Sequence, residues 1–195
     1  MIAMQIAPCG HIDTNVFKHA VKSDADFEPQ NHPSHIKEWN KTQAHAVRCI
    51  IELTRHGDFT ICKESEMIWE IGFTTDLAEA KRHNTLLAGI AMKKLDPPFT
   101  HSRIIGRTKE EATANLEEML DFGIAHHSRM AEIYRATGAD GKKADAYHIW
   151  TAEAAGVDFF ISLDKKLINS IRHQNKITIK TEVLYPAEVV CRLVK

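Results

Sequence analysis

The sequence predicts an α/β protein, with a mostly parallel sheet and helices on both of its faces. Short runs of β-branched and aromatic residues alternate along the chain with longer stretches in which apolar residues have helical spacing. Strands that are separated by helices pair in parallel, because each helix returns the chain to the starting edge of the sheet. The 195 residues are typical of one domain, so we expect residues 1–195 to form a single unit.

The first part of the chain contains two predicted strands and two predicted helices. Residues 11–17 begin as a short strand and give way to a loop or a helix. Apolar residues at helical spacing, with Gly57 just beyond the last of them, predict a helix over 34–56. The β-branched and aromatic run 59–62 predicts a strand, and a second helix is expected over 66–74.

The middle of the chain is dominated by helical signals. The region 81–105 is apolar over 86–95, is then broken by two prolines, and ends in a short strand candidate over 101–105. A capping box over 108–111 predicts the start of a long helix that runs to about Tyr134.

The C-terminal part again alternates between helix and strand. A helix that starts at Asp145 is followed by an apolar strand over 158–163. A short helix is expected over 165–173, an alternating strand over 177–184, and a final turn or helix from 186–188.

Charge and cysteine spacing argue against several classes of function. The net charge of −1, from 25 basic and 26 acidic residues, disfavours an extended surface for duplex nucleic acid, but it allows a cleft that takes a short single strand of RNA. The four cysteines show no C-x-x-C spacing, which favours free thiols. No export signal and no apolar segment of membrane-spanning length are present, so we expect a cytoplasmic protein that does not contact a membrane.

Four carboxylates are predicted to meet at one edge of the sheet. Asp13 and Asp164 each follow a predicted strand, Asp145 begins a helix, and Glu70 lies about one turn into the helix after strand 59–62. Ligand sites of parallel sheets lie beyond the carboxyl ends of the strands. Carboxylates this close raise one another's pKa values, and a hard cation such as Mg²⁺ or Mn²⁺ relieves the repulsion. A metal-activated water can then attack a phosphodiester.

Four segments of the chain resemble the PIN-domain family in their order and spacing. They are Ile12-Asp13-Thr14-Asn15-Val16, Ser65-Glu66-Met67-Ile68-Trp69-Glu70-Ile71, Lys143-Ala144-Asp145-Ala146 and Ile161-Ser162-Leu163-Asp164-Lys165-Lys166-Leu167. The resemblance implies a three-layer α/β/α sandwich, with helical elaborations near 34–56 and 81–105, and activity as a Mg²⁺- or Mn²⁺-dependent endoribonuclease. Many members of that family are toxins of toxin–antitoxin pairs. This implies single-stranded or structured RNA as the substrate, and an antitoxin protein and a homodimer as partners.

The resemblance also implies roles for individual residues. The expected metal ligands and catalytic residues are Asp13, Glu70, Asp145 and Asp164, with Glu66 as the alternative to Glu70. The residues expected to bind the substrate are Thr14, Asn15, Lys142, Lys143 and Lys165.

Several alternatives stay open from the sequence. Each acid taken alone also fits a helix cap, a turn or an exposed position. Lys166 stands where many PIN toxins carry a further acid, which leaves open the number of metals and an inactive RNA-binding or scaffold module of the same fold. A phosphatase of the haloacid dehalogenase type needs a second Asp two residues after Asp13, where this chain has Asn15. The histidines show no zinc spacing, and core packing is the expected role of the tryptophans Trp39, Trp69 and Trp150.

Overall fold

In the part of the chain that the structure describes, the centre is a sheet of five parallel strands. The structure is a computed structural model, and it describes residues 7–22, 33–63, 77–99, 109–138, 142–174 and 177–194. The strands are β1 (Cys9–Ile12), β2 (Thr60–Lys63), β3 (Lys93–Lys94), β4 (Phe159–Ile161) and β5 (Glu182–Leu184). Their order across the sheet is β3-β2-β1-β4-β5, so β1 lies in the middle.

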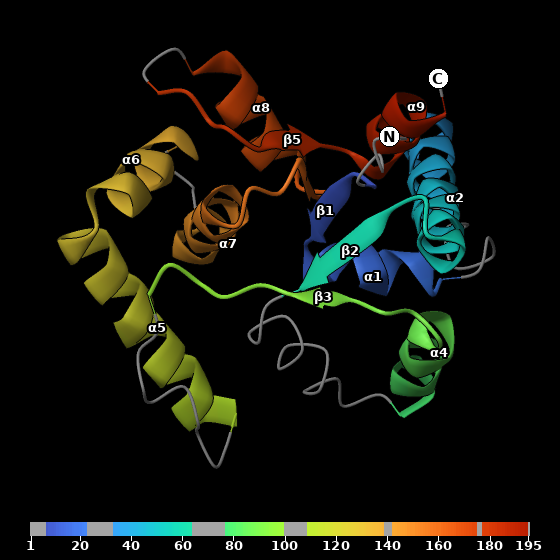
Figure 1. Cartoon of the computed structure of the whole chain (residues 1–195), viewed down its shortest axis with the longest axis horizontal. Helices are drawn as coiled ribbons and strands as arrows, with labels where there is room; N and C mark the ends of the chain where they lie inside the picture. The colour runs from blue at the N-terminus through green and yellow to red at the C-terminus, as the bar shows by residue number, and fades with distance from the viewer. Residues whose placement is uncertain are drawn as a thin grey trace, which may run out of the picture.

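Helices cover both faces of this sheet (Figure 1). One face carries α1 (Thr14–Ala20), α2 (Ser34–His56), α4 (Leu77–Leu87) and α9 (Pro186–Leu193). The other face carries α6 (Ser128–Ala136), α7 (Lys143–Ala154) and α8 (Lys165–His173), and α5 (Lys109–His126) packs against α6 and α7. The predicted α/β class, a parallel sheet between two helical layers, is therefore confirmed.

Side chains on neighbouring strands form two rows, one for each face, because successive residues of a strand point to opposite sides. The row that faces α1, α2 and α9 is Ile12, Ile161 and Leu184. The row that faces α6, α7 and α8 is Cys62, His11, Phe160 and Val183. The second row therefore places a buried histidine at the centre of the sheet, against the helical layer that also carries Asp145.

Several elements agree with the sequence analysis. Helices α2 and α8 have the predicted bounds, and β2 is shifted by one residue from the predicted strand. The segment 34–56, expected as an elaboration, supplies Val47, Ile50 and Ile51 to the core and so belongs to the helical layer. The predicted helix 66–74 and strand 101–105 lie outside the described residues. Within the described ranges, no helix is long and apolar enough to cross a membrane.

The predicted long helix over 108–134 is two helices, α5 and α6, which meet at His127. His127 has an extended backbone, with φ −120° and ψ 103°. The reason is visible in the apolar spacing, because Ile133 comes two and a half turns after Ile124 and would lie on the opposite side of a continuous helix. The break lets Ile133 be fully buried against the sheet layer, while Leu120 packs in a separate cluster with Met130 and Tyr147.

The last strand is shorter than the alternation over 177–184 predicts. Only Glu182–Leu184 pair with β4, since β4 itself begins at Phe159. The backbone just before β5 is bonded to side chains instead. Arg129 donates to the Thr178 carbonyl oxygen at 2.7 Å, and the Lys180 N–H donates to Glu153 Oε1 at 2.6 Å.

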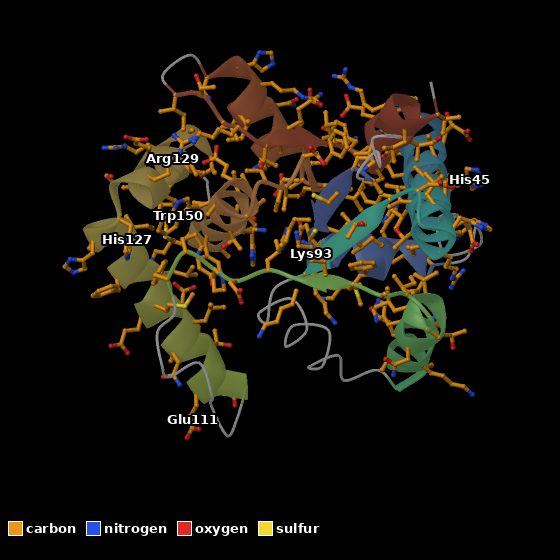
Figure 2. The ribbon with its side chains drawn as sticks, in the orientation of Figure 1. His45, Lys93, Glu111, His127, Arg129 and Trp150 are labelled. Atoms are coloured by element: carbon orange, nitrogen blue, oxygen red, sulfur yellow. The ribbon has the colours of Figure 1, made fainter. Side chains whose placement is uncertain are left out.

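Arg129 joins α6, α7 and the segment before β5 (Figure 2). Its guanidinium donates two hydrogen bonds to Glu153, from Nε to Oε2 at 2.9 Å and from Nη2 to Oε1 at 2.7 Å. The Glu153 side chain is only 4% exposed. This carboxylate therefore depends on Arg129 for charge compensation.

We expect Arg129→Ala to lower the free energy of unfolding by about 2–3 kcal/mol, because the variant leaves the Glu153 carboxylate buried without its partner. Chemical denaturation measures this effect. A matched control is Arg192→Ala, since Arg192 forms a 3.6 Å ion pair with Glu182 and both side chains are half exposed. The control should lose less than about 1 kcal/mol. Equal losses in the two variants would show that the Arg129 contacts have no special role.

Candidate functional site

The candidate site lies where the winding of the sheet changes direction. Strands β1 and β4 are neighbours, but the helix that follows β1 packs on one face and the helix that follows β4 packs on the other. The segments that follow β1 and β4 separate beyond the carboxyl ends of these strands, which is where open α/β sheets bind ligands. Asp13 follows β1 and Asp164 follows β4 at this point.

Asp13 is the N-cap of α1 and is largely buried. Its Oδ1 accepts a hydrogen bond from the Asn15 N–H at 3.4 Å, and its Oδ2 accepts one from the Ser162 hydroxyl at 3.0 Å. Burial raises the pKa of Asp13, although these hydrogen bonds and the charges of His11 and Lys142 act in the opposite direction. The carboxylate is thus held in a fixed orientation in surroundings that disfavour its negative charge.

Asp164 is the N-cap of α8, and Ser162 connects it to Asp13. Asp164 Oδ1 accepts hydrogen bonds from the Lys166 and Leu167 N–H groups at 2.9 and 3.0 Å. The Asp164 N–H donates to Ser162 Oγ at 3.1 Å, and the same hydroxyl donates to Asp13. Ser162 is fully buried. One hydroxyl group therefore fixes the relative position of two acids that are 151 residues apart in the chain.

Asp145 lies in the first turn of α7, on the helical layer that faces Asp13. Burial raises its pKa to about 6; the charges of Asp13 and Asp164 add to the rise, and Lys142 opposes it. Carboxylates influence one another in this way only at short range. The structure thus brings three of the four predicted acids, from three separate segments, to the same edge of the sheet.

The described residues do not by themselves complete a metal site. Within 7–22, 33–63, 77–99, 109–138, 142–174 and 177–194, no three His, Cys, Asp or Glu side chains are close enough together to hold a metal ion. Glu70 and its alternative Glu66, the expected second acid, lie outside these ranges. We refer to Asp13, Asp145 and Asp164 together as the acidic pocket; these three carboxylates alone are not close enough together to hold a metal ion.

Two histidines lie within three residues of the acids in the chain. His11 precedes Asp13 by two residues on β1 and so points to the same face, and His148 follows Asp145 by one helical turn on α7. Their rings are stacked, with centroids 5.8 Å apart, and the His11 ring is also stacked with that of Phe160, with centroids 5.4 Å apart. Burial, with a smaller contribution from His11, lowers the pKa of His148 to about 3, so His148 is neutral at physiological pH. The pair forms an aromatic layer that is neutral on its His148 side.

The residues predicted to bind substrate have different surroundings. Lys142 is exposed and close enough to Asp13 and Asp145 to lower the pKa values of both. Lys143 instead forms ion pairs with α5, at 2.6 Å from Asp121 and 3.4 Å from Glu117.

The remaining three lie beside the strand ends. Thr14 is buried, and Asn15 is exposed with its N–H bonded to Asp13. Lys165 directly follows Asp164, and its ammonium lies 3.9 Å from the centre of the Trp39 ring. Lys142 and Lys165 are thus the two predicted basic residues that stand next to the acids.

Sequence reasoning missed three features of this edge. Ser162 is a polar residue at the end of an apolar strand, two residues before Asp164, and this position was the signal in the sequence. Only the fold reveals its hydrogen bond to Asp13. The His11–His148 stack joins two residues far apart in the chain. Trp39 was expected in the core, but it is partly exposed and lies outside the hydrophobic clusters of the described residues, so that expectation is wrong. Trp150 packs on the core as predicted, where α5, α6 and α7 meet (Figure 2).

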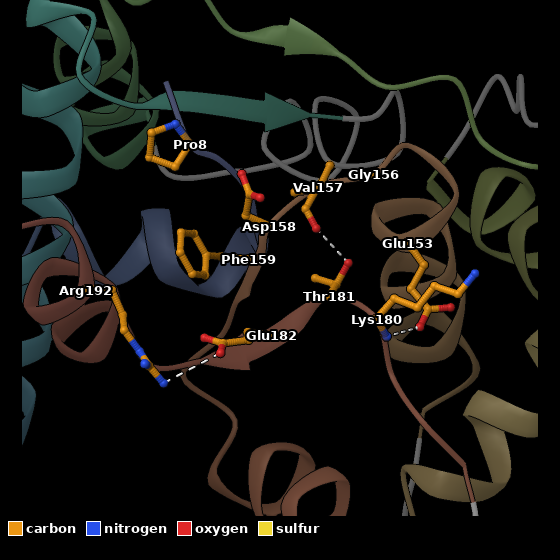
Figure 3. Close-up of a pocket in the computed structure, with 10 residues that line it drawn as sticks. All are labelled: Pro8, Glu153, Gly156, Val157, Asp158, Phe159, Lys180, Thr181, Glu182 and Arg192. Atoms are coloured by element: carbon orange, nitrogen blue, oxygen red, sulfur yellow. Dashed lines mark hydrogen bonds and ion pairs between the residues drawn. The ribbon is translucent and has the colours of Figure 1, made fainter. Parts of the chain in front are cut away.

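A separate cavity of about 550 Å³ lies at the opposite edge of the sheet, at the amino ends of β4 and β5 (Figure 3). Its polar groups are bonded to one another. Thr181 Oγ1 donates to the Val157 carbonyl oxygen at 2.9 Å, and Glu182 pairs with Arg192. The Asp158 carboxylate accepts a hydrogen bond from the Cys9 N–H at 2.8 Å. These contacts account for most of the polar groups that line the cavity, and we take the acidic pocket as the candidate site.

Replacing Asp145 with Asn should stabilise the fold above pH 6. The pKa of Asp145 is raised, so its charged form is disfavoured in the folded state; the penalty is complete above the folded pKa of about 6 and vanishes below the ordinary value of 3.8. Because the side chain is partly exposed, we expect a gain of about 1 kcal/mol in the free energy of unfolding at neutral pH and none at low pH. Denaturation at both pH values measures it. Asp58→Asn, at an exposed position near the other edge, should change little, and a destabilised Asp145→Asn would contradict the electrostatic account.

Removing the Ser162 hydroxyl should weaken the fold and raise the pKa of Asp13 further. Ser162→Ala leaves Asp13 Oδ2 and the Asp164 N–H without this partner, so we expect a loss of about 1–2 kcal/mol. The Asp13 pKa can be followed by carboxyl NMR. Thr42→Ala is the control, because the Thr42 hydroxyl bonds only to the Glu38 carbonyl oxygen on an exposed helix surface. An unchanged Asp13 pKa would show that the serine does not hold this carboxylate.

Comparisons with known proteins show no family for this chain, so the functional assignment depends on the geometry of the acidic pocket. The chain matches no protein-family model, no curated protein and no solved structure.

Proposed function

We propose that the protein is a Mg²⁺- or Mn²⁺-dependent endoribonuclease, with Asp13, Asp145 and Asp164 in its active site and Glu70 as the fourth acid. One observation carries the proposal. Acids from three distant segments meet at the point of the sheet where ligands bind, and the other two acids raise the pKa of Asp145. Natural proteins retain such repulsion mainly at functional sites.

The chemistry of the donors fits a hard cation. Carboxylate oxygens are the ligands that Mg²⁺ and Mn²⁺ prefer, and these ions usually keep several waters and substrate phosphate oxygens. When bound, such an ion activates water and stabilises the leaving oxygen of a phosphodiester. His148, one helical turn after Asp145, is neutral, so it adds no positive charge that would compete with a bound cation.

The protein's own residues would position the reactants. Ser162 and the Asn15 N–H hold the Asp13 carboxylate, and the α8 amide groups hold Asp164, so both acids are oriented before substrate arrives. Lys142, exposed beside Asp13 and Asp145, is suited to bind the scissile phosphate. Lys143 is engaged with α5 and would contribute less.

The proposed substrate, partners and location follow from the resemblance to PIN domains. The substrate would be single-stranded or structured RNA, and a toxin role would add an antitoxin protein and a second copy of this chain as partners. The free thiols of Cys9, Cys49, Cys62 and Cys191 suit the reducing cytoplasm.

Cleavage of single-stranded RNA in Mn²⁺ tests the activity. We expect wild type to cleave internally, EDTA to stop the reaction, and Asp13→Asn and Asp145→Asn each to slow it by about 100-fold or more, because each removes a ligand charge. Asp58→Asn should cleave like wild type. Equal rates for wild type and both site variants would reject the assignment of the site.

Metal binding can be measured without activity. Mn²⁺ should raise the melting temperature of wild type and of Asp58→Asn, since a ligand that binds the folded state stabilises it, and should have less effect on Asp13→Asn and Asp145→Asn. The rival function is a non-catalytic RNA-binding module, favoured by Lys166 and by the absence of a three-ligand group among the described residues. RNA binding with neither cleavage nor a Mn²⁺ effect would establish that rival.

A further inference from the structure

An aromatic and cationic cluster lies beside the acids, at the ends of β4 and β5. We call it the Trp39 cluster; its members are Trp39, Lys165, Tyr185 and Arg172. The Lys165 ammonium lies 3.9 Å from the centre of the Trp39 ring. The Trp39 and Tyr185 rings meet edge to face with centroids 5.6 Å apart, and the Arg172 guanidinium lies 5.5 Å from the Tyr185 ring centre.

The cluster belongs to the same edge of the sheet as the acidic pocket. Lys165 follows Asp164 directly, and Tyr185 directly follows the last residue of β5. Burial raises the pKa of Tyr185, and the charges of Glu188 and Asp164 act in the same direction against Arg172, so Asp164 lies within electrostatic reach of the ring. The Trp39 cluster is thus the next group of side chains along this edge after Asp164.

Trp39 is not explained by packing in the core. Its side chain is partly exposed and lies outside the hydrophobic clusters of the described residues, although α2 buries six other residues. A partly exposed tryptophan with a lysine over its ring combines a flat apolar surface with a positive charge. Single-stranded nucleic acids are bound by this combination, because bases stack on aromatic rings and phosphates pair with nearby cations.

We propose that Trp39 and Lys165 form a nucleotide subsite next to the acidic pocket. An unpaired base of the RNA stacks on the Trp39 ring, and the Lys165 ammonium binds the phosphate between that nucleotide and the acids. The subsite rests on the proposed function and extends it, since stacking of this kind requires a base that is not in a duplex and so selects single-stranded substrate.

Binding of a short single-stranded RNA to wild type in EDTA tests the subsite without cleavage. An abasic oligomer of the same length, which carries the phosphates but no bases, is the matched probe. Trp39→Leu should weaken binding of the RNA by about 5- to 100-fold and leave the abasic oligomer unaffected, given the usual contribution of one stacked base. Lys165→Gln should weaken both probes and reduce the salt dependence of binding by about one phosphate contact. Equal affinity of wild type and Trp39→Leu for the RNA, or an equal loss for both probes, would overturn the proposal.

Tryptophan fluorescence gives a second measurement that does not depend on a disruptive variant. The measurement is made in a Trp69→Phe background, because Trp69 neighbours the proposed fourth acid, Glu70. In that background, RNA binding should quench the emission of the protein and of its Trp150→Phe variant, since Trp150 lies among α5, α6 and α7, but not that of its Trp39→Phe variant. Quenching that persists in Trp39→Phe would overturn the subsite.

The proposal of the subsite and the proposal of nuclease activity can be rejected independently of each other. Wild type that cleaves RNA with the same kcat/KM as Trp39→Leu overturns the subsite and leaves the nuclease standing. Binding that depends on Trp39, in a protein that never cleaves, supports the subsite and rejects the nuclease.

Discussion

Because β1 lies in the middle of an all-parallel sheet, the chain winds outward from it in two directions. The helix after β1 covers one face and the helix after β4 covers the other, so the two segments diverge where β1 and β4 end. Asp13 and Asp164 are the first residues beyond the core at this divergence, and α7 brings Asp145 to them from the second helical layer. The acidic pocket therefore lies where the strand order reverses, which is the usual position of ligand sites in open α/β sheets.

The pocket is held together by groups that do not carry its charge. The Ser162 hydroxyl connects two acids, and the stacked rings of His11 and His148 fill the space beneath them. A charged residue in place of His148 would add electrostatic interactions at the base of the pocket, whereas a neutral ring separates the acids from the core. The fold thus tolerates the mutual repulsion of the carboxylates through these hydrogen bonds and packed rings, and through Lys142, whose charge opposes the rise in the pKa values of Asp13 and Asp145.

Local signals in the sequence were sufficient where an element depends on its own residues. The bounds of α2 follow from apolar spacing and Gly57, and the start of α8 follows from Asp164 as its cap. Local signals were insufficient where contacts between segments far apart in the chain determine the structure. The break at His127 serves the burial of Ile133 against the sheet layer. Strand β5 is short because its partner β4 begins at Phe159, and side chains of Arg129 and Glu153 bond to the backbone before it. The approach of Asp13 to Asp145 was predicted from their positions after a strand and at the start of a helix, but the link through Ser162 and the exposure of Trp39 depend on contacts across the fold.

Two of the three acids have a second duty, and it affects how experiments on them can be interpreted. Asp13 and Asp164 each accept hydrogen bonds from the first amide groups of a helix, while Asp145 caps no helix. Alanine at Asp13 or Asp164 would remove a cap together with a charge, so lost activity would be mixed with lost structure. Asparagine keeps the capping oxygen and removes only the charge. Among the three, Asp145 is the position where a substitution best separates an effect on catalysis from an effect on stability, because it removes no helix cap.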